Sequence, residues 1–342
     1  MLYSGEFKPI FKKVARTLYL SLRVLPKSLR EPMGLAYLLA RAADTIADTE
    51  LVGIDERQQC LARLKSRLSE PGTDPDEWRL LRWGGVADLP EEGMLLQELD
   101  SLLAGYWRLD PADRGDVKAV LEDLIFGMEQ DLKRTSLADL QELDTYCHYA
   151  AGVVGVFWSR MLARHEPRLA GLDWAQMAQW GDEFGKGLQL INVIKDIAKD
   201  HRHGRCYLPE TELHRLGLTP QDLGDSGKLT TLRPLIDYLI GQSLQALTSG
   251  QNYILQLPRM GYFIRLAALW PLWIGLATLE FLIRDEHLLD PNTPHKIPRR
   301  QLRHLLAKSF VCVGTDRLLT RYFERATDRL KNSPIESRAK AK

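Results

Sequence analysis

The sequence is rich in strong helix formers and poor in β-branched residues, and this bias limits the folds open to it more than any other feature. Leucine outnumbers valine about fivefold, and no alternation of apolar and polar residues between turn signals indicates a strand. Apolar positions instead recur at helical spacing. The runs that predict helices cover residues 32–49, 55–68, 93–108, 114–133, 137–165, 174–200, 232–256, 265–284 and 301–330. The expected fold class is therefore all-α.

Turn-forming segments separate these runs, but none is long enough to be a flexible linker between domains. Residues 70–75, 218–230 and 290–294 are rich in Pro, Gly and Asp and predict loops. A chain of 342 residues can bury a substantial core. We therefore expect one large helical domain over residues 1–332 and a polar, frayed tail over residues 333–342.

The charge balance and the cysteines exclude several functional classes. With 46 basic and 45 acidic side chains, the chain has no general attraction for nucleic acid. The four cysteines are far apart and form no CxxC pair, which argues against a structural zinc site or a redox motif. Isolated cysteines, together with an N-terminus that shows no secretory signal, favour a cytoplasmic protein.

Residues 266–283 form a long apolar stretch in which Glu280 is the only charged residue. The stretch is long enough to be considered as a membrane span, but a central helix of an all-α protein has the same composition. We favour the central helix. Its composition also suits the wall of a cavity for a hydrocarbon ligand.

Asp44 and Asp48 are four residues apart on a predicted helix, so their carboxylates project from one face. The apolar run before them, residues 33–40, indicates that this helix is buried, where an ionised carboxylate needs a cationic partner. A divalent metal is one candidate partner and Arg41 is another. By itself the spacing favours a solvated helix face, where acid pairs four residues apart are common.

The same spacing returns at Asp196 and Asp200, on a helix that carries Gln189 and Asn192 along the same polar stripe. Two such helices, facing each other, would present four carboxylates across a gap. These ligands suit Mg²⁺, a hard cation that is commonly bound through a few carboxylates together with substrate phosphates. The repeated pattern therefore favours a magnesium site over two solvated faces.

Residues 146–155, with the sequence YCHYAAGVVG, resemble the YCHYVAGxVG segment of squalene synthases, within the squalene/phytoene synthase family of head-to-head prenyl transferases. Residues 44–48 match the first aspartate-rich motif of that family, and residues 188–209 resemble the second motif with its trailing GRxxxP. Two departures reduce the match. Residues 15–18 keep only the arginine and one hydroxyl of the family's SRSF segment, and Ala47 and Lys199 stand where many relatives have an acid.

The resemblance implies an isoprenoid synthase fold around a central hydrophobic cavity. It also implies that two farnesyl diphosphates are joined head to head through presqualene diphosphate and then reduced by NADPH to squalene. A relative that stops at presqualene diphosphate or makes dehydrosqualene stays open as an alternative. So does a non-catalytic helical protein that binds isoprenoids.

The resemblance also assigns roles to individual residues. Tyr146 would serve the proton and cation chemistry of cyclopropane closure, with its π face available to a positive charge. The catalytic Mg²⁺ would be held by Asp44, Asp48, Asn192, Asp196 and Asp200. The substrate would be bound by Arg16, Tyr37, Arg41, Gln189, Asn192 and Arg205.

No Rossmann fingerprint is visible, so NADPH would be held by other means. Lys296 and Arg299 belong to a basic cluster in a region where squalene synthases carry a similar run credited with the phosphates of NADPH, and Lys195 lies beside Asp196. A solvated loop is the alternative for this cluster. Because residues 338–342 are polar and basic rather than an apolar anchor, we expect at most a weak peripheral association with membranes.

Overall fold

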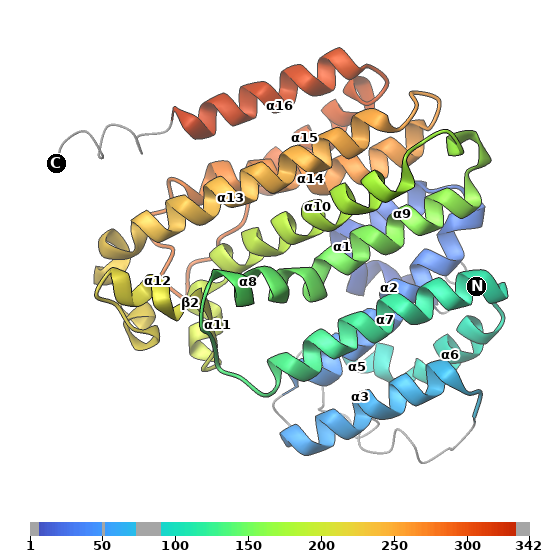
Figure 1. Ribbon diagram of the computed structural model, residues 1–342, viewed down its shortest axis with the longest axis horizontal. Coiled ribbons are helices and arrows are strands. Elements are labelled where there is room, and N and C mark those ends of the chain that lie inside the picture. The colour runs from blue at the N-terminus through green and yellow to red at the C-terminus, as the bar shows by residue number, and fades with distance from the viewer. Residues whose placement is uncertain (1–6, 50–51, 73–89, 333–342) are drawn as a thin grey trace. The chain divides into compact units, whose positions relative to one another are not determined.

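The computed structural model describes residues 7–49, 52–72 and 90–332, with the backbone alone for residues 7, 8 and 15–18. The described chain is almost entirely helical, which confirms the all-α prediction (Figure 1). It forms two compact units, one of residues 1–133 and 157–174 and the other of residues 134–156 and 175–342. The single domain over residues 1–332 stays a prediction.

The first unit is built around helix α2, which contacts each of the other N-terminal helices. Its helices are α1 (Phe7–Val24), α2 (Lys27–Asp48), α3 (Ile54–Ser69), α5 (Pro90–Gln97), α6 (Leu99–Trp107), α7 (Pro111–Asp131) and most of α9 (Val153–His165). Leu35, Leu38 and Leu39 of α2 are fully buried. Helix α1 was not predicted, although Ile10 and Val14 have helical spacing and are both buried.

The second unit carries the rest of the chain. Its elements are β1 (Ser136–Leu137), α8 (Leu140–Cys147), a π-helical turn (His148–Gly152), the start of α9, α10 (Trp174–Lys195), α11 (Ile197–Arg202), β2 (Cys206–Pro209), α12 (Glu210–Arg215), 3₁₀ turns at Pro220–Gly224 and Ser226–Lys228, α13 (Leu229–Gln256), α14 (Tyr262–Leu282), α15 (Arg299–Cys312) and α16 (Asp316–Lys331). Helices α13 to α16 lie side by side in Figure 1.

Helix α14 is the apolar stretch recognised in the sequence, and it forms the core of this second unit. The Trp270 indole donates a hydrogen bond of 2.8 Å to the Ser309 hydroxyl of α15, and the ring of Trp273 stacks on Tyr322 of α16 at 3.8 Å. Glu280 is paired with Arg329 of α16. By length and composition α14 could cross a membrane, but 72% of its apolar window is buried inside the protein. These contacts agree with the central helix favoured above.

Several predicted helices are interrupted. The run over residues 137–165 contains the π-helical turn, and the run over residues 174–200 breaks at Asp196, whose φ of −102° and ψ of 10° leave the helical region. The runs over residues 93–108 and 301–330 each form two helices. Local breaks of this kind leave the apolar period intact, so periodicity alone did not reveal them.

The otherwise helical chain contains one pair of short strands that the sequence did not reveal. Strands β1 and β2 pair in parallel, with Ser136 opposite Cys206 and Leu137 opposite Pro209. Strands of two and four residues are too short to show an alternating pattern. Their pairing is nevertheless important, because it holds the segment before α8 against the segment after α11.

Helices α9 and α10 approach each other so closely that their backbones touch. A Cβ atom added at Gly155 would lie 1.9 Å from the carbonyl oxygen of Gly181, and one added at Gly185 would lie 2.3 Å from that of Ala151. No side chain fits at either position. The glycines therefore fix the distance between the YCHY segment and the second aspartate motif.

We expect Gly155→Ala to lower the free energy of unfolding by about 2 kcal/mol or more, because the new methyl group meets rigid backbone rather than a side chain that can move. Gly115→Ala is the matched control, since Gly115 lies within α7 with open space around its Cα. That change should stabilise the protein by up to about 1 kcal/mol. Urea unfolding followed by circular dichroism measures both, and equal midpoints for the two variants would contradict the close contact.

Candidate active site

The first aspartate motif lies at the C-terminal end of α2, where Arg41 is its immediate electrostatic partner. The guanidinium of Arg41 forms one ion pair with Asp44 and a second with Glu92 of α5. Asp48, one helical turn further on, is exposed. Of the two partners considered for Asp44, the structure therefore shows the arginine.

Glu92 is a member of this cluster that the sequence did not reveal. It lies 48 positions after Asp44 and is 9% exposed, so its carboxylate meets Arg41 in a largely dry environment. Its position at the start of α5 carried no recognisable signal. The hydroxyl of Tyr37 donates to the backbone oxygen of Val14 at 3.2 Å and so ties α2 to α1. Arg16 lies on α1, outside the residues whose side chains the structure describes.

A continuous chain of polar contacts follows one face of α10 from Tyr146 to Asp196. Gln189 donates to the Tyr146 hydroxyl at 3.2 Å, and Asn192 donates to Gln189 at 3.3 Å. Lys195 donates to Asn192 at 2.9 Å and lies 3.2 Å from the carboxylate of Asp196. The structure thus brings together the predicted stripe as far as Asp196, with Tyr146 at its other end.

The aromatic ring of Tyr146 already has neighbours. It stacks on Tyr207 of β2 with the ring centres 4.5 Å apart, and the Arg134 guanidinium lies 5.8 Å from the ring centre. The pairing of β1 with β2 explains this arrangement, because it brings the chain segments of Arg134 and Tyr207 beside each other. The hydroxyl of Tyr146 is consequently a better candidate for chemistry than its π face.

The turn that follows Asp200 brings Arg205 next to Asp200. The backbone N–H of Arg205 donates to the Asp200 carbonyl at 2.9 Å, and that of Gly204 donates to the His201 carbonyl at 3.0 Å. This pair of bonds is the Schellman motif, and Gly204 adopts the positive φ of 69° that the motif requires. The Arg205 side chain then donates to the Tyr207 hydroxyl at 3.0 Å. The GR pair of the second motif therefore sets a cation beside the last aspartate.

Both motifs contain a carboxyl group whose pKa is far above its ordinary value. Burial raises the pKa of Asp44 to about 7, and the nearby Asp48 carboxylate raises it further against the opposing effect of Arg41. Burial likewise raises the pKa of Asp200 to about 7, with Asp196 as the second cause. In each motif, burial and a neighbouring carboxylate both disfavour the ionised form of the aspartate. A cation bound between the two carboxylates would offset this cost, so each motif is a favourable place for a bound cation.

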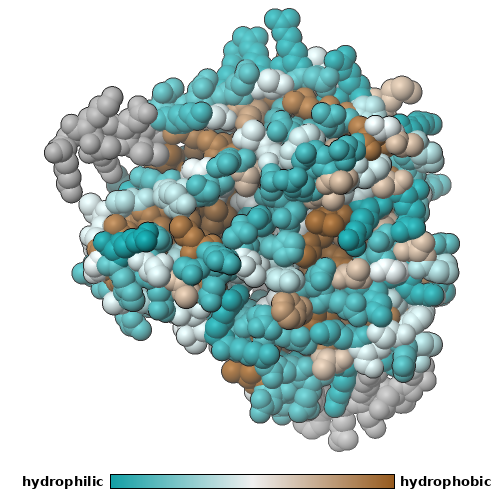
Figure 2. All heavy atoms as spheres, viewed as in Figure 1, coloured by the Kyte–Doolittle hydropathy of each residue, from teal (hydrophilic) through white to brown (hydrophobic). Residues whose placement is uncertain are grey.

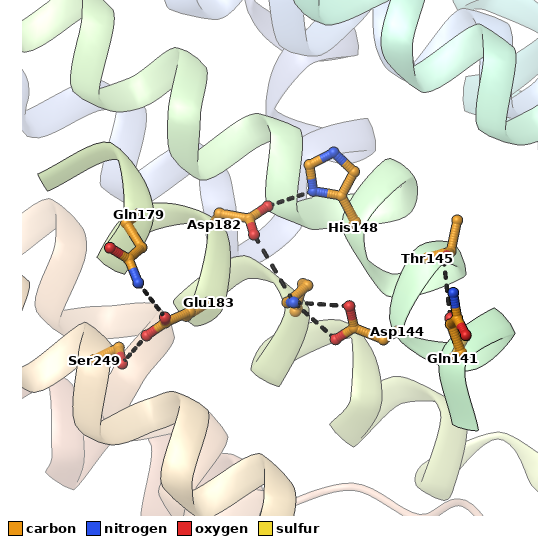
Figure 3. Close-up of polar contacts among 9 residues, drawn as sticks. Gln141, Asp144, Thr145, His148, Gln179, Asp182, Glu183 and Ser249 are labelled. Atoms are coloured by element: carbon orange, nitrogen blue, oxygen red, sulfur yellow. Dashed lines mark hydrogen bonds and ion pairs between the residues drawn. The ribbon is translucent and has the colours of Figure 1, made fainter. Parts of the chain in front are cut away.

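A second polar network connects α8 and the π-helical turn to α10 on another part of the helix surface. Figure 3 shows the ring of His148 pointing at the carboxylate of Asp182, and the two are 2.6 Å apart. Asp182 also lies 3.9 Å from Lys186, which pairs with Asp144 at 2.7 Å. The network holds the segment on both sides of Tyr146 against α10. His148 therefore positions this segment through its contact with Asp182.

The basic cluster of Lys296 and Arg299 lies at the surface, at the end of the loop that precedes α15. The buried imidazole of His295 meets the buried Asp285 carboxylate at 2.6 Å and fixes this loop. Arg202 of α11 donates to the carbonyl oxygen of Pro291 at 2.5 Å. The loop is thereby held against the helix of the second aspartate motif. Exposed cations at such a place fit the phosphates of a dinucleotide.

The donor chemistry of both motifs fits Mg²⁺. Within the described ranges, no three acidic, histidine or cysteine side chains come together closely enough to bind a metal by themselves. Each motif offers two carboxylates, which is the usual protein contribution when phosphates and water complete the shell. The expectation that the two motifs face each other across a gap stays a prediction, because they belong to different units.

Comparison with known proteins identifies the family. A sequence profile described as squalene/phytoene synthase matches residues 11–301. The chain belongs to the squalene/phytoene synthase family. This family makes isoprenoids by head-to-head prenyl transfer, and the fold expected from the resemblance is confirmed by solved relatives. The squalene synthase TcSQS, solved with the ligand E5700, superposes with a TM-score of 0.78 at 20% identity, covering 94% of this chain and 89% of that one.

The relatives of this squalene/phytoene synthase family member include several activities. The squalene synthase of Bos taurus is 23% identical over 96% of this chain and 76% of its own length. The presqualene diphosphate synthase of Rhodopseudomonas palustris is 29% identical over 64% of this chain and 68% of its own. Identities this close to one another support the family reaction without selecting one product.

Mg²⁺ should raise the melting temperature of the protein more at about pH 8 than at about pH 6, because it competes with the protons on Asp44 and Asp200. Unfolded aspartates ionise near pH 4. These two raised pKa values therefore lower the free energy of unfolding of the metal-free protein as the pH rises from about 4 to about 7. Scanning fluorimetry with Mg²⁺, and with K⁺ as the control, measures the difference. An equal shift at both pH values would contradict metal binding at these carboxylates.

Proposed function

We propose that this protein is a squalene synthase, which condenses two farnesyl diphosphates to presqualene diphosphate and then reduces that intermediate with NADPH. The polar chain from Tyr146 through Gln189 and Asn192 to Asp196 carries the proposal, because it links the YCHY segment to the diphosphate-binding motif. This linkage also argues against a non-catalytic binder, which would need no such arrangement of charged and proton-bearing groups.

The first chemical demand is the departure of an allylic diphosphate. Mg²⁺, when bound, supplies positive charge that neutralises the leaving group. The chain's own cations would add to this: Arg41 beside Asp44 in one motif, and Lys195 and Arg205 beside the aspartates of the other. Since these cations are held in place by carboxylates and tyrosines before substrate arrives, little reorganisation is required.

The second demand is to keep water from the carbocation that remains. The π-helical turn and the following residues contribute Ala150, Ala151 and Val153, and α14 contributes a wall of apolar residues. At Gly275 the backbone of α14 comes so close to α10 that an added Cβ would lie 3.1 Å from Leu188. We propose that these apolar surfaces line the hydrocarbon cavity implied by the family fold.

Closing the cyclopropane ring forms a second carbon–carbon bond at C1 of the ionised farnesyl group, and the C–H bond that breaks at this carbon supplies the electron pair and releases one proton. We assign its transfer to the hydroxyl of Tyr146, which takes up this proton as it gives its own to the released diphosphate. The hydrogen bond from Gln189 orients the hydroxyl oxygen, and the stacking on Tyr207 restrains the ring. Both restraints come from residues that the second motif positions.

A presqualene diphosphate synthase is the second candidate, and the match to the Rhodopseudomonas palustris enzyme favours it. Incubation of the purified protein with farnesyl diphosphate and Mg²⁺, with and without NADPH, separates the two. Squalene formed only in the presence of NADPH supports the reductive reaction. The same product under both conditions would show that there is no reductive step and would favour a presqualene diphosphate or dehydrosqualene synthase.

Asp48→Asn and Asp200→Asn should each remove most of the Mg²⁺-dependent consumption of farnesyl diphosphate and leave the circular dichroism spectrum unchanged, since each deletes one anionic ligand from an electrostatic site. Asp328→Asn, at an exposed aspartate of α16, is the matched control and should retain full activity. Full turnover by both site variants would contradict the assignment of Asp48 and Asp200 as Mg²⁺ ligands. Full turnover by the wild type in excess chelator would contradict the dependence on Mg²⁺ itself.

Lys296→Ala should slow squalene formation while presqualene diphosphate accumulates. The change removes a charge-assisted contact to a phosphate and so weakens the binding of NADPH. The first half-reaction does not use NADPH and should keep its rate. Product analysis by mass spectrometry over a range of NADPH concentrations measures the ratio of the two lipids. Lys331→Ala, at another exposed lysine, serves as the control. Equal loss of both half-reactions in Lys296→Ala would instead assign Lys296 to the diphosphate site.

A further inference from the structure

Four large apolar side chains reach the surface where α14 begins and α15 ends. Met260 is 83% exposed, Val311 73%, Phe263 55% and Phe310 48%. The Tyr262 hydroxyl donates to the backbone oxygen of Phe310, so the two helix ends are held together. Lighter brown side chains are visible in Figure 2 near the loop from α13 to α14, where much of the surrounding surface is hydrophilic. We call these four residues the apolar tip.

The helix that supplies half of the apolar tip is strongly basic. Helix α15 has the sequence RRQLRHLLAKSFVC, which contains four arginine or lysine residues and no acidic residue. Arg303 and Lys308 are exposed, and Lys308 lies over the ring of Tyr322 at 4.7 Å. Asp316, the acid that follows α15 in the chain, is paired with Arg259 and Arg265. The charge beside the apolar tip is therefore positive.

An exposed apolar group near the exposed cations Arg303 and Lys308 is complementary to a bilayer that contains anionic lipids. Apolar side chains gain by entering the acyl region, and cations gain by contact with anionic headgroups. We propose that the apolar tip, together with the exposed Arg303 and Lys308 of α15, docks this protein onto the surface of an anionic phospholipid bilayer.

The course of α14 gives this docking surface a functional meaning, and here the inference rests on the proposed function. Helix α14 begins at the apolar tip with Tyr262, and 13 residues further on, about 20 Å along the axis, Gly275 contacts Leu188 and Ile191 of α10. Those residues flank the polar stripe of the second aspartate motif. The same helix therefore connects the bilayer surface with the apolar wall of the site, which suits an enzyme whose product dissolves only in lipid.

The test is co-sedimentation of the full chain with vesicles of phosphatidylcholine and phosphatidylglycerol, compared with vesicles of phosphatidylcholine alone, without substrate. Wild-type protein should bind the mixed vesicles preferentially. Met260→Ser with Val311→Ser should weaken binding about tenfold, since two apolar side chains no longer enter the bilayer. Arg303→Gln with Lys308→Gln should abolish the preference for anionic lipid. Ile54→Ser, at an exposed apolar residue of the other unit, is the control and should bind normally.

Absence of vesicle binding by the wild type, or equal binding by all variants, would overturn the proposal. If Met260→Ser with Val311→Ser instead dissociated an oligomer during gel filtration, the tip would be an interface between copies of the chain and the lipid assignment would be wrong. Binding is measured without turnover. A wild-type protein that consumes farnesyl diphosphate but does not bind vesicles would thus refute only the docking surface. A wild-type protein that binds vesicles but does not consume farnesyl diphosphate would refute only the proposed function.

Discussion

The close contact between α9 and α10 is the constraint on which the candidate site depends. Because Gly155 and Gly185 let the two backbones touch, the end of α8 lies within hydrogen-bond reach of α10. Tyr146 and Gln189 meet across this contact, and the His148–Asp182 pair holds it from another side. A wider separation would leave each side chain in place on its own helix and still break the polar chain.

In both aspartate motifs two carboxylates lie close together, and neighbouring cations partly offset their repulsion. The two motifs differ in where these cations come from. In α2, Arg41 is shared between Asp44 and Glu92, so one cation serves two carboxylates. At the end of α10, the cations come from the sequence neighbours Lys195 and Arg205. Neither arrangement brings the pKa of the half-buried Asp44 or Asp200 carboxyl group back to its ordinary value. Each motif consequently retains a demand for positive charge that a divalent cation can meet.

Helix α14 shows how one apolar sequence can serve several purposes. Its middle is enclosed by α13, α15 and α16, which explains why a stretch long enough to span a membrane is the core of the second unit. The absence of a side chain at Gly275 allows close packing on α10. Its first turn, with Phe263, reaches the surface beside the basic helix α15. Composition alone could not separate these roles, because burial depends on what packs around the helix.

The amino-acid sequence by itself determined the helical class, the family motifs and most members of the polar stripe, because each of these depends on residue type and spacing within one segment. The short strands, the break at Asp196 and the π-helical turn escaped prediction, since they are too short to change an apolar period. Tertiary structure alone decided that Glu92 shares Arg41 and that Tyr207 stacks on Tyr146. These partners are distant in sequence, and only the packing of helices and the pairing of β1 with β2 bring them into contact.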